Sequence, residues 1–395
     1  MKHLLRILLI STGLLIVLFL VSPSYLHQAI LHGNPGIEDY QFFHNRTIEA
    51  GEAQPWKIAA AVNGFVMGDS MTKVIESYLP IAYLVIQDEE VIYERYWEGF
   101  DENSLSNSFS AAKSIVSLLV GIAIDEGKIK NVDDKVGNYL PAFNEGRNKE
   151  LTIRDLLTMS SGLNWDEAYS SPFSMTTKAY YGSDLRGLIN GLEVVETPGK
   201  EFDYLSGNTE VLAMVVQAAT GQTISDYTSG KIWKHIGAVN DALWCLDSED
   251  GMEKAYCCFN SNARDFARFG QLILNHGKWD GHQIVSESYV EEATTPASYL
   301  VDKEDRKSVG FYGYQWWIIH YKGYVIPYMR GILGQYIFAI PGKNAVVVRL
   351  GHDRSHEYKD HHTLDIYTYL DAAFMILDSR DAAKQNKPFQ EKGKT

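Results

Sequence analysis

Residues 108–140 read SFSAAKSIVSLLVGIAIDEGKIKNVDDKVGNYL, with a serine and a lysine directly ahead of a long apolar run. The run Ile115–Ile124 ends at the acidic and glycine residues 125–127, which is typical of a helix C-terminus. Ser110 and Lys113 therefore fall in the first turn and share one helix face. A helix N-terminus favours developing negative charge, and a partly buried lysine with a lowered pKa can accept the serine proton. The stretch predicts a nucleophilic serine beside a lysine.

The chain contains a second Ser-x-x-Lys match at Ser70 and Lys73, so this motif alone has low specificity. Ser110 follows a predicted hairpin and leads a long apolar helix, whereas Ser70 leads a shorter and more polar segment. For Ser70 and Lys73 we favour a helix N-cap and a solvated lysine.

The remaining pattern predicts a sheet assembled from both ends of the chain. An early hairpin is predicted over 82–96, with its turn at 88–90. Four late strands are rich in aromatic and β-branched residues, at Tyr312–Ile319, Tyr324–Met329, Gln335–Ile340 and Ala345–Leu350. Helices are expected at Ile153–Met159, Glu210–Thr220, Asn262–Leu274 and Leu364–Leu377. We therefore expect an α/β (α+β) fold, in which an antiparallel sheet is flanked by helices and joined to a mostly helical lobe.

Length and composition allow a large core and exclude one class of partner. The chain has 395 residues, of which 45% are hydrophobic and 22% charged. A net charge of -14 disfavours nucleic acid, whose binding needs a basic surface. The three cysteines do not make a disulfide framework. A single bridge from Cys245 to Cys257 or Cys258 stays open, with one thiol left over.

The N-terminus has the pattern of an export signal. Lys2, His3 and Arg6 precede the apolar run Ile7–Val21, and Ser22 and Ser24 supply small residues for cleavage. The run is short for a membrane span of about 20 apolar residues. Membrane anchoring through residues 4–21 stays open when Leu4 and Leu5 are counted. We expect an exported protein, periplasmic or extracellular.

These patterns divide the chain into four parts. They are a signal peptide or signal anchor (1–24), an irregular lead-in (25–75), the main domain (76–380) with its helical lobe at about 128–300, and a polar tail (381–395).

Further motifs follow the serine–lysine stretch in a fixed order. They are LTIRDLLTMSSGL at 151–163, FDYLSGN at 202–208 after a Thr-Pro-Gly turn, NARDFARFG at 262–270 and GILGQ at 331–335. Their ordered combination resembles the β-lactamase-related serine hydrolase family, which includes class C β-lactamases, DD-peptidases, esterases and 6-aminohexanoate-dimer hydrolase. The resemblance covers roughly residues 75–378, and its sub-pattern is most like that of the nylon-oligomer hydrolases. It implies a β-lactamase/transpeptidase-like fold.

The resemblance also implies catalytic roles. Ser110 would be the acylated nucleophile, Lys113 its base or proton relay, and Tyr204 a second general acid/base. Ser206 completes the Tyr-x-Ser motif. A nearby ammonium is expected to lower the pKa of Tyr204 toward the working range. Tyr-x-Ser also occurs at Tyr169 and Tyr227, but only the match at Tyr204 has a preceding Pro-Gly turn and a following apolar helix. A buried structural tyrosine is the alternative.

The third motif of the family departs from its usual pattern. Many members have Lys or His, a variable residue and Gly on the inner strand, where this chain has Met329, Arg330 and Gly331. Met329 cannot bind a carboxylate, which argues against β-lactam recognition. Strand alternation would turn Arg330 to the other face unless the strand bulges. The resemblance still implies an oxyanion hole from the N–H groups of Ser110 and Ile332, with Gly331 allowing close approach to the substrate.

Candidate substrate-binding residues are Ser206, Tyr181, Gly331 and Arg330. Tyr181 and its neighbour Tyr180 lie where some relatives place substrate contacts, although core packing explains them equally well. Trp316 and Trp317 are adjacent on a strand, so one should face the core and the other a cleft.

Three alternatives remain. An SGNH-type esterase would use Ser70 with Asp353 and His356. A metal site from histidines 352, 356, 361 and 362 with Asp353 and Asp360 lacks a His-Glu-x-x-His spacing. A non-catalytic sensor on the same fold is the third. We favour a serine hydrolase that acts on small esters or amides through an acyl-enzyme, without a metal or cofactor. The oligomeric state stays open.

Overall fold

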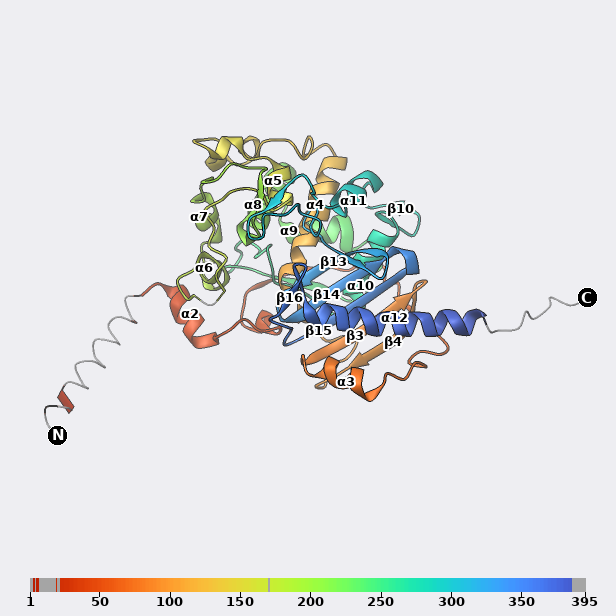
Figure 1. Cartoon of the computed structure of the whole chain (residues 1–395). Coiled ribbons are helices and arrows are strands. Elements are labelled where there is room, and N and C mark those ends of the chain that lie inside the picture. Colours follow the sequence, from red (N-terminus) through yellow and green to blue (C-terminus); the bar gives the residue numbers. More distant parts are fainter. Residues whose placement is uncertain (1–2, 4, 7–18, 20–21, 170, 386–395) are drawn as a thin grey trace, which may run out of the picture.

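The computed structural model describes residues 3, 5–6, 19, 22–169 and 171–385. Apart from Phe19, the predicted export segment Ile7–Val21 lies outside the described residues, as does most of the polar tail. Among the helices that are described, none is long and apolar enough to cross a membrane. Figure 1 shows a sheet with helices on both faces and a second, mostly helical lobe above it.

The main sheet has seven strands in the order β12-β13-β14-β15-β3-β4-β2. Their bounds are β2 Lys57–Ile58, β3 Pro80–Gln87, β4 Glu90–Tyr96, β12 Trp317–Tyr321, β13 Tyr324–Gly331, β14 Gln335–Ile340 and β15 Ala345–Gly351. All neighbours are antiparallel except β2 and β4. Asp88 and Glu89 have φ values of 54° and 61°, the left-handed conformations that a tight two-residue hairpin requires. Because β15 pairs with β3, the expected sheet built from both chain ends is confirmed.

One late strand begins later than expected. The predicted strand Tyr312–Ile319 corresponds to β12, which starts at Trp317. Ahead of it the chain turns at Gln315, where φ is 62°. The buried Gln315 amide donates to the Leu156 carbonyl and accepts from the Thr209 hydroxyl. This segment is therefore tied to the helical lobe instead of extending the sheet.

The expectation of an irregular lead-in over 25–75 is wrong. The segment contains α2 (Ser24–His32), β1 (Asn45–Ile48), β2 and α3 (Asp69–Glu76). β1 is the edge of a second sheet with the order β1-β7-β8-β5, in which β5 is Ser106–Asn107, β7 Ala242–Cys245 and β8 Phe259–Ser261. Elements this short carry too few residues for a periodic pattern, which is why the sequence did not predict them. The two strands form by pairing with strands distant in sequence, β1 with β7 and β2 with β4.

Helices cover both faces of the main sheet. α12 (Leu364–Gln385) lies over one face together with α3, and α10 (Ala263–Leu274) packs on the other against β14 and β15 (Figure 1). Asn262 caps α10 by accepting the Asp265 N–H.

The helical lobe is organised around α4 (Ala112–Asp125) and α8 (Ser206–Thr220), which pack against each other. The other helices of the lobe are α5 Ile153–Leu157, α6 Met175–Tyr181, α7 Leu185–Asn190, α9 Ile224–Thr228 and α11 Glu287–Ala293. Short strands complete the chain: β6 Glu201–Phe202, β9 Lys278–Trp279, β10 His282–Gln283, β11 Val301–Asp302, β16 Tyr358–Lys359 and β17 His362–Thr363. Every residue of α4 from Ala112 to Ala123 is buried. The first turn of α4 is thereby fixed where the lobe meets the main sheet.

Candidate active site

Ser110 lies in η2 (Phe109–Ala111), a 3₁₀ helix of one turn that leads into α4. Lys113 follows in the first turn of α4 with 1% of its surface exposed. Its Nζ donates to Ser110 Oγ at 3.1 Å, to Ser206 Oγ at 3.1 Å and to the Tyr256 carbonyl at 2.8 Å. Burial lowers the pKa of Lys113 to about 8, against the opposing effect of the carboxylates of Glu167 and Glu210. The contact expected between the serine and the lysine is present.

Tyr204 lies in the same cleft as Ser110, and the Lys113 ammonium lies 5.2 Å from the centroid of the Tyr204 ring. Burial raises the pKa of Tyr204, and the Glu167 carboxylate adds to that effect, while the nearby Ser110 hydroxyl and the Arg330 guanidinium oppose it. The expected fall in the pKa of Tyr204 is therefore wrong. Desolvation of the phenolate outweighs the charges around it, so the group is held as a phenol.

Glu167 is the site residue that the sequence did not reveal. It accepts the Ser206 main-chain N–H at 2.6 Å and the Ser206 hydroxyl at 2.7 Å. Trp165 Nε1 donates to it at 2.7 Å, and the Tyr169 hydroxyl donates as well. Its carboxylate lies at the N-terminus of α8, where the helix dipole favours negative charge. No local pattern marks this glutamate, because its role depends on contact with a helix that begins 39 residues later.

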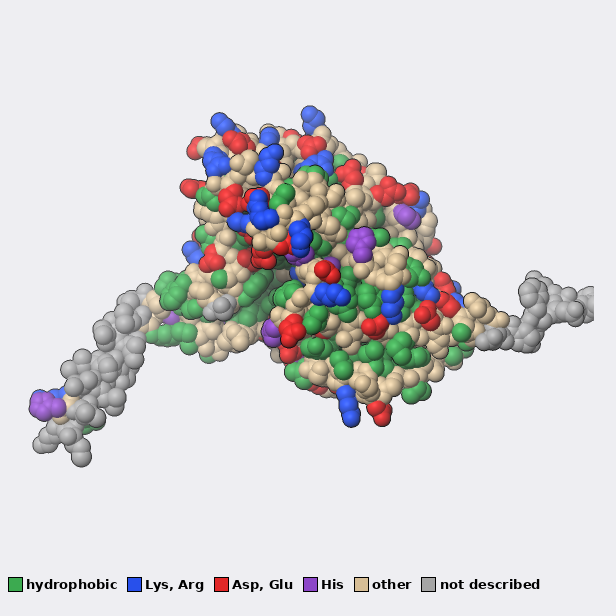
Figure 2. All heavy atoms as spheres, viewed as in Figure 1, with side chains coloured by type: hydrophobic (Ala, Val, Ile, Leu, Met, Phe, Trp, Pro, Cys, Tyr) green, Lys and Arg blue, Asp and Glu red, His purple; other side chains and the backbone are tan. Residues whose placement is uncertain are grey.

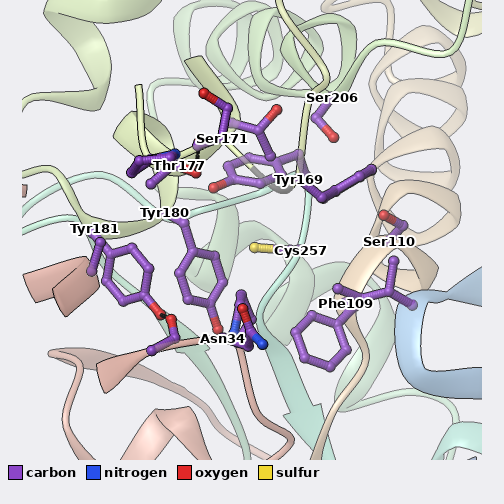
Figure 3. Close-up of a pocket in the computed structure, with 17 residues that line it drawn as sticks. Asn34, Phe109, Ser110, Tyr169, Ser171, Thr177, Tyr180, Tyr181, Ser206 and Cys257 are labelled. Atoms are coloured by element: carbon purple, nitrogen blue, oxygen red, sulfur yellow. Dashed lines mark hydrogen bonds between the residues drawn. The ribbon is translucent and has the colours of Figure 1, made fainter. Parts of the chain in front are cut away.

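Two cavities meet at Ser110. The smaller, which we name the aromatic pocket, holds about 220 Å³ and is drawn in Figure 3. Its lining is mostly apolar or aromatic: Ala29, Gly33, Asn34, Pro35, Phe109, Ser110, Tyr169, Ser171, Pro172, Thr176, Thr177, Tyr180, Tyr181, Ser206, Tyr256, Cys257 and Ile332. The larger, the polar cleft, holds about 660 Å³. Its lining carries most of the charges: Ser110, Glu167, Tyr169, Phe202, Asp203, Tyr204, Asp302, Lys303, Glu304, Phe311, Trp317, Arg330, Gly331, Ile332, Arg354, Tyr358 and His361. Figure 2 shows acidic and basic side chains gathered around a hollow between the two lobes.

Gly331 lines the polar cleft and also allows a close approach within the protein. A Cβ on Gly331 would lie 2.2 Å from the Ser108 carbonyl oxygen, so glycine lets the end of β13 press against the segment that carries Ser110. Ile332 follows directly and, like Ser110, borders both cavities. The turn after Ile332 is held by the buried guanidinium of Arg349, which donates to the carbonyls of Leu333 at 2.6 Å and Gly334 at 2.7 Å.

Met329 and Arg330 alternate as a regular strand requires. Met329 is fully buried in the core, while Arg330 pairs with Tyr336 in an unbroken register. A bulge is not needed for Arg330 to reach the site, contrary to expectation, because its long side chain extends into the polar cleft. Its guanidinium carbon lies 3.2 Å from the centroid of the Trp317 ring. The opposite placement of the two tryptophans is confirmed, since Trp316 is buried in the core and Trp317 lines the cleft.

Tyr180 and Tyr181 both line the aromatic pocket. Their hydroxyls are engaged, Tyr181 with the Gly33 carbonyl at 2.7 Å and Tyr180 with Asp39 at 2.7 Å. Figure 3 shows the two rings side by side, with the hydroxyls directed toward the segment that carries Asn34. The rings, not the hydroxyls, are thus offered to the cavity.

Of the residues of the rival sites, His361 lines the polar cleft, whereas Ser70 and His356 lie outside the two cavities at Ser110. Ser70 is exposed on α3, and the His356 side chain, 3.9 Å from Asp353, is 91% exposed, so neither has the enclosed setting that activates a serine. His362 is buried against the Tyr328 hydroxyl, and burial lowers its pKa to about 3. His361 instead stacks on Phe311 near Asp305.

The cysteines pair differently from either expected bridge. Cys257 and Cys258 are bonded to each other, and Cys245 is a buried free thiol. Cys258 has a φ of 68°, a left-handed conformation that bends the chain between the two adjacent residues. Cys257 lies in the wall of the aromatic pocket (Figure 3).

The comparison with known protein families decides what kind of site this is. Residues 73–368 match the family model described as Beta-lactamase. The chain belongs to the beta-lactamase family. The 6-aminohexanoate-dimer hydrolase of Paenarthrobacter ureafaciens is 28% identical over 284 residues, 68% of this chain and 71% of that protein. For this beta-lactamase family member, the expected relationship to that group of hydrolases is confirmed.

Solved structures show the same fold at lower identity. A Bacillus anthracis structure assigned as a 6-aminohexanoate-dimer hydrolase has a TM-score of 0.73 at 21% identity, covering 87% of this chain and 92% of that one. A family VIII carboxylesterase has a TM-score of 0.58 at 16% identity, with 79% and 99% covered. The expected β-lactamase/transpeptidase-like fold is confirmed. Because its family and its relatives are hydrolases, this member of the beta-lactamase family is a serine hydrolase that works through an acyl-enzyme.

Proposed function

We propose that the protein cleaves small esters or amides in two acyl-transfer steps at Ser110. The observation that carries the proposal is the buried Lys113 Nζ, which lies 3.1 Å from the Ser110 hydroxyl and has a pKa lowered to about 8. An amine with this pKa is partly neutral near pH 7 and can serve as a general base.

The hydrogen bonds around Lys113 support its proposed role as the base for Ser110. The Tyr256 carbonyl can only accept a hydrogen bond, and the Ser206 hydroxyl has its proton committed to Glu167. A neutral amine has two N–H groups, and these two acceptors take both of them. Its lone pair is then directed at the Ser110 hydroxyl, the third partner of Nζ. Ser206 acts in this scheme by orienting the base as well as by lining the aromatic pocket.

Tyr204 is proposed as the general acid. Its raised pKa keeps the proton on the phenol, and its position with Ser110 in the polar cleft puts that proton near the reacting bond. The serine proton moves to Lys113 as the Ser110 oxygen bonds the acyl carbon. The phenol proton moves to the leaving group as its bond to that carbon breaks, and the proton on Lys113 then restores the phenol. Water repeats the sequence in reverse and releases the acid.

The proposed oxyanion hole is formed by the main-chain N–H groups of Ser110 and Ile332. Both residues border the two cavities, and Gly331 permits the close packing of β13 on the Ser110 segment. Such donors stabilise charge that develops only in the tetrahedral intermediate.

Substrate selection is proposed to differ from that of a β-lactamase. Met329 is buried and apolar at the position where many members carry a basic residue, whereas Arg330 reaches the polar cleft from the opposite face of β13. Small esters or amides therefore fit the site better than β-lactams, with Arg330 contacting the polar part and Tyr181 the apolar part.

We also propose export of the chain. Support comes from the basic residues and the apolar run among its first 21 residues. The N-terminal segment is either cleaved as a signal peptide or kept as a membrane anchor. The molecular mass of the protein, measured in the membrane and soluble fractions of expressing cells, distinguishes the two outcomes.

A panel of acyl donors tests the proposed reaction. It comprises p-nitrophenyl esters, nitrocefin, the 6-aminohexanoate dimer and a D-Ala-D-Ala peptide, assayed with wild type, Ser110→Ala and the matched control Ser70→Ala. We expect hydrolysis of esters or the amide, a loss of at least about 10³-fold in Ser110→Ala and no change in Ser70→Ala. Activity that survives in Ser110→Ala would contradict the proposal, and its loss in Ser70→Ala would favour an SGNH-type site.

A further inference from the structure

The aromatic pocket has a wall made by a segment outside the region matched by the family model. That region begins at residue 73, whereas Ala29, Gly33, Asn34 and Pro35 of the N-terminal segment line the cavity. Phe109 and residues in and around α6 also line the pocket. This N-terminal segment therefore closes a space that opens directly onto the nucleophile.

The N-terminal segment is held in place by specific contacts. α2 packs against α6, and the Tyr181 hydroxyl donates to the Gly33 carbonyl at 2.7 Å. Asp39 accepts the Gly36 N–H at 2.9 Å and the Tyr180 hydroxyl at 2.7 Å. The polar atoms of both tyrosines are thus satisfied by the segment itself, which leaves their ring surfaces to meet whatever enters the pocket.

The two cavities at Ser110 differ in chemistry. Phe109, Tyr181 and Ile332 give the aromatic pocket a largely apolar surface. The polar cleft on the other side of Ser110 carries the guanidinium groups of Arg330 and Arg354 among its many charges. A substrate whose scissile bond lies at Ser110 must place one end in each.

We propose that the aromatic pocket is an acyl pocket, which selects esters or amides of apolar aliphatic acids, and that the N-terminal segment determines the acyl length accepted. The proposal rests on the proposed acyl transfer at Ser110 and names its substrate class. The polar leaving group then occupies the cleft, on the side of Tyr204, where it receives its proton. Each methylene that fits the pocket raises kcat/KM about fourfold, the equivalent of about 0.8 kcal/mol of apolar burial.

A chain-length series on the full-length protein tests the proposal. p-Nitrophenyl acetate, butanoate, hexanoate, octanoate and dodecanoate are compared by kcat/KM for wild type, Ala29→Trp and Ile30→Trp. Ala29 lines the pocket, whereas Ile30, its neighbour on α2, is 70% exposed and serves as the matched control. We expect wild-type kcat/KM to rise from acetate and then fall once the chain exceeds the pocket. Ala29→Trp should lower kcat/KM for hexanoate at least tenfold more than it lowers kcat/KM for acetate, while Ile30→Trp keeps the wild-type ratio.

The outcomes that would overturn the proposal are distinguishable. Hydrolysis that depends on Ser110 but has the same kcat/KM for all chain lengths in wild type would overturn the acyl pocket and leave the proposed function standing. If Ala29→Trp and wild type have the same kcat/KM for hexanoate, the proposed role of the N-terminal segment is overturned. Absence of any Ser110-dependent hydrolysis would remove both proposals. Retained acetate activity shows that Ala29→Trp is folded, and the wild-type series tests the acyl pocket even where that variant does not fold.

Discussion

Replacing Glu167 with glutamine should move the acid limb of the pH profile of kcat/KM to lower pH. In the proposed mechanism only neutral Lys113 accepts the serine proton, so wild-type activity rises with pH and levels off above the lysine pKa of about 8. The Glu167 carboxylate stabilises the ammonium and raises that pKa. Removing the carboxylate therefore lowers the pKa of Lys113, and the acid limb of the pH profile moves to lower pH with it.

The magnitude follows from the path through Ser206. Two hydrogen bonds, of 3.1 Å from Lys113 to Ser206 and 2.7 Å from Ser206 to Glu167, place the opposite charges within about 6 Å. At an effective dielectric constant of about 20 they interact by about 3 kcal/mol, and solvent screening of the partly exposed glutamate reduces this by about half. With 1.36 kcal/mol per pKa unit, the midpoint should fall by about one to two pH units.

The assay is kcat/KM for a p-nitrophenyl ester from pH 5 to 10 in wild type, Glu167→Gln and Tyr169→Phe. Glutamine keeps an acceptor for the Ser206 N–H, and Tyr169→Phe removes one hydrogen bond to Glu167 while leaving its charge. The control should therefore keep the wild-type midpoint. A midpoint in Glu167→Gln that stays at the wild-type pH or rises would refute the electrostatic coupling of Glu167 to Lys113.

Three further changes have definite expected outcomes. Lys113→Met should lower kcat/KM by at least about 10³-fold at every pH and abolish the limb near pH 8, as read from the same profiles. Tyr204→Phe should cost roughly 10²- to 10⁴-fold for alkyl esters and far less for p-nitrophenyl esters, whose leaving group needs no proton; an equal loss for both would contradict its role as the acid. Arg349→Met leaves the Leu333 and Gly334 carbonyls without their donor and should lower the free energy of unfolding by about 3 kcal/mol in urea titrations. A variant as stable as wild type would show that water replaces the guanidinium.

The features that the sequence predicted well are those set by local pattern. The Ser110–Lys113 contact follows from spacing within one helical turn, and the hairpin of β3 and β4 follows from two apolar runs around a polar turn. Ser110 and Tyr204 come from two helix starts that are far apart in the chain, and only the family resemblance predicted that they share one cleft.

The features that the sequence missed depend on tertiary packing. Glu167 carries no motif, and its importance appears only when the loop that bears it meets the N-terminus of α8. The pKa of Tyr204 was expected to fall because a cation was expected nearby, but burial in the folded site decides the direction. One wall of the aromatic pocket comes from α2 and the residues directly after it, in a region whose short elements gave no periodic signal.

Covalent labelling of the full chain tests the central claim that Lys113 makes Ser110 reactive. The protein is treated with a fluorophosphonate across pH 6 to 10, and the adduct is quantified by intact mass and located by peptide mapping. The account predicts one adduct per chain, on Ser110, at a rate that rises through pH 8 in parallel with deprotonation of Lys113. An adduct on Ser70 or any other residue, or labelling of Ser110 at a rate independent of pH in this range, would contradict it.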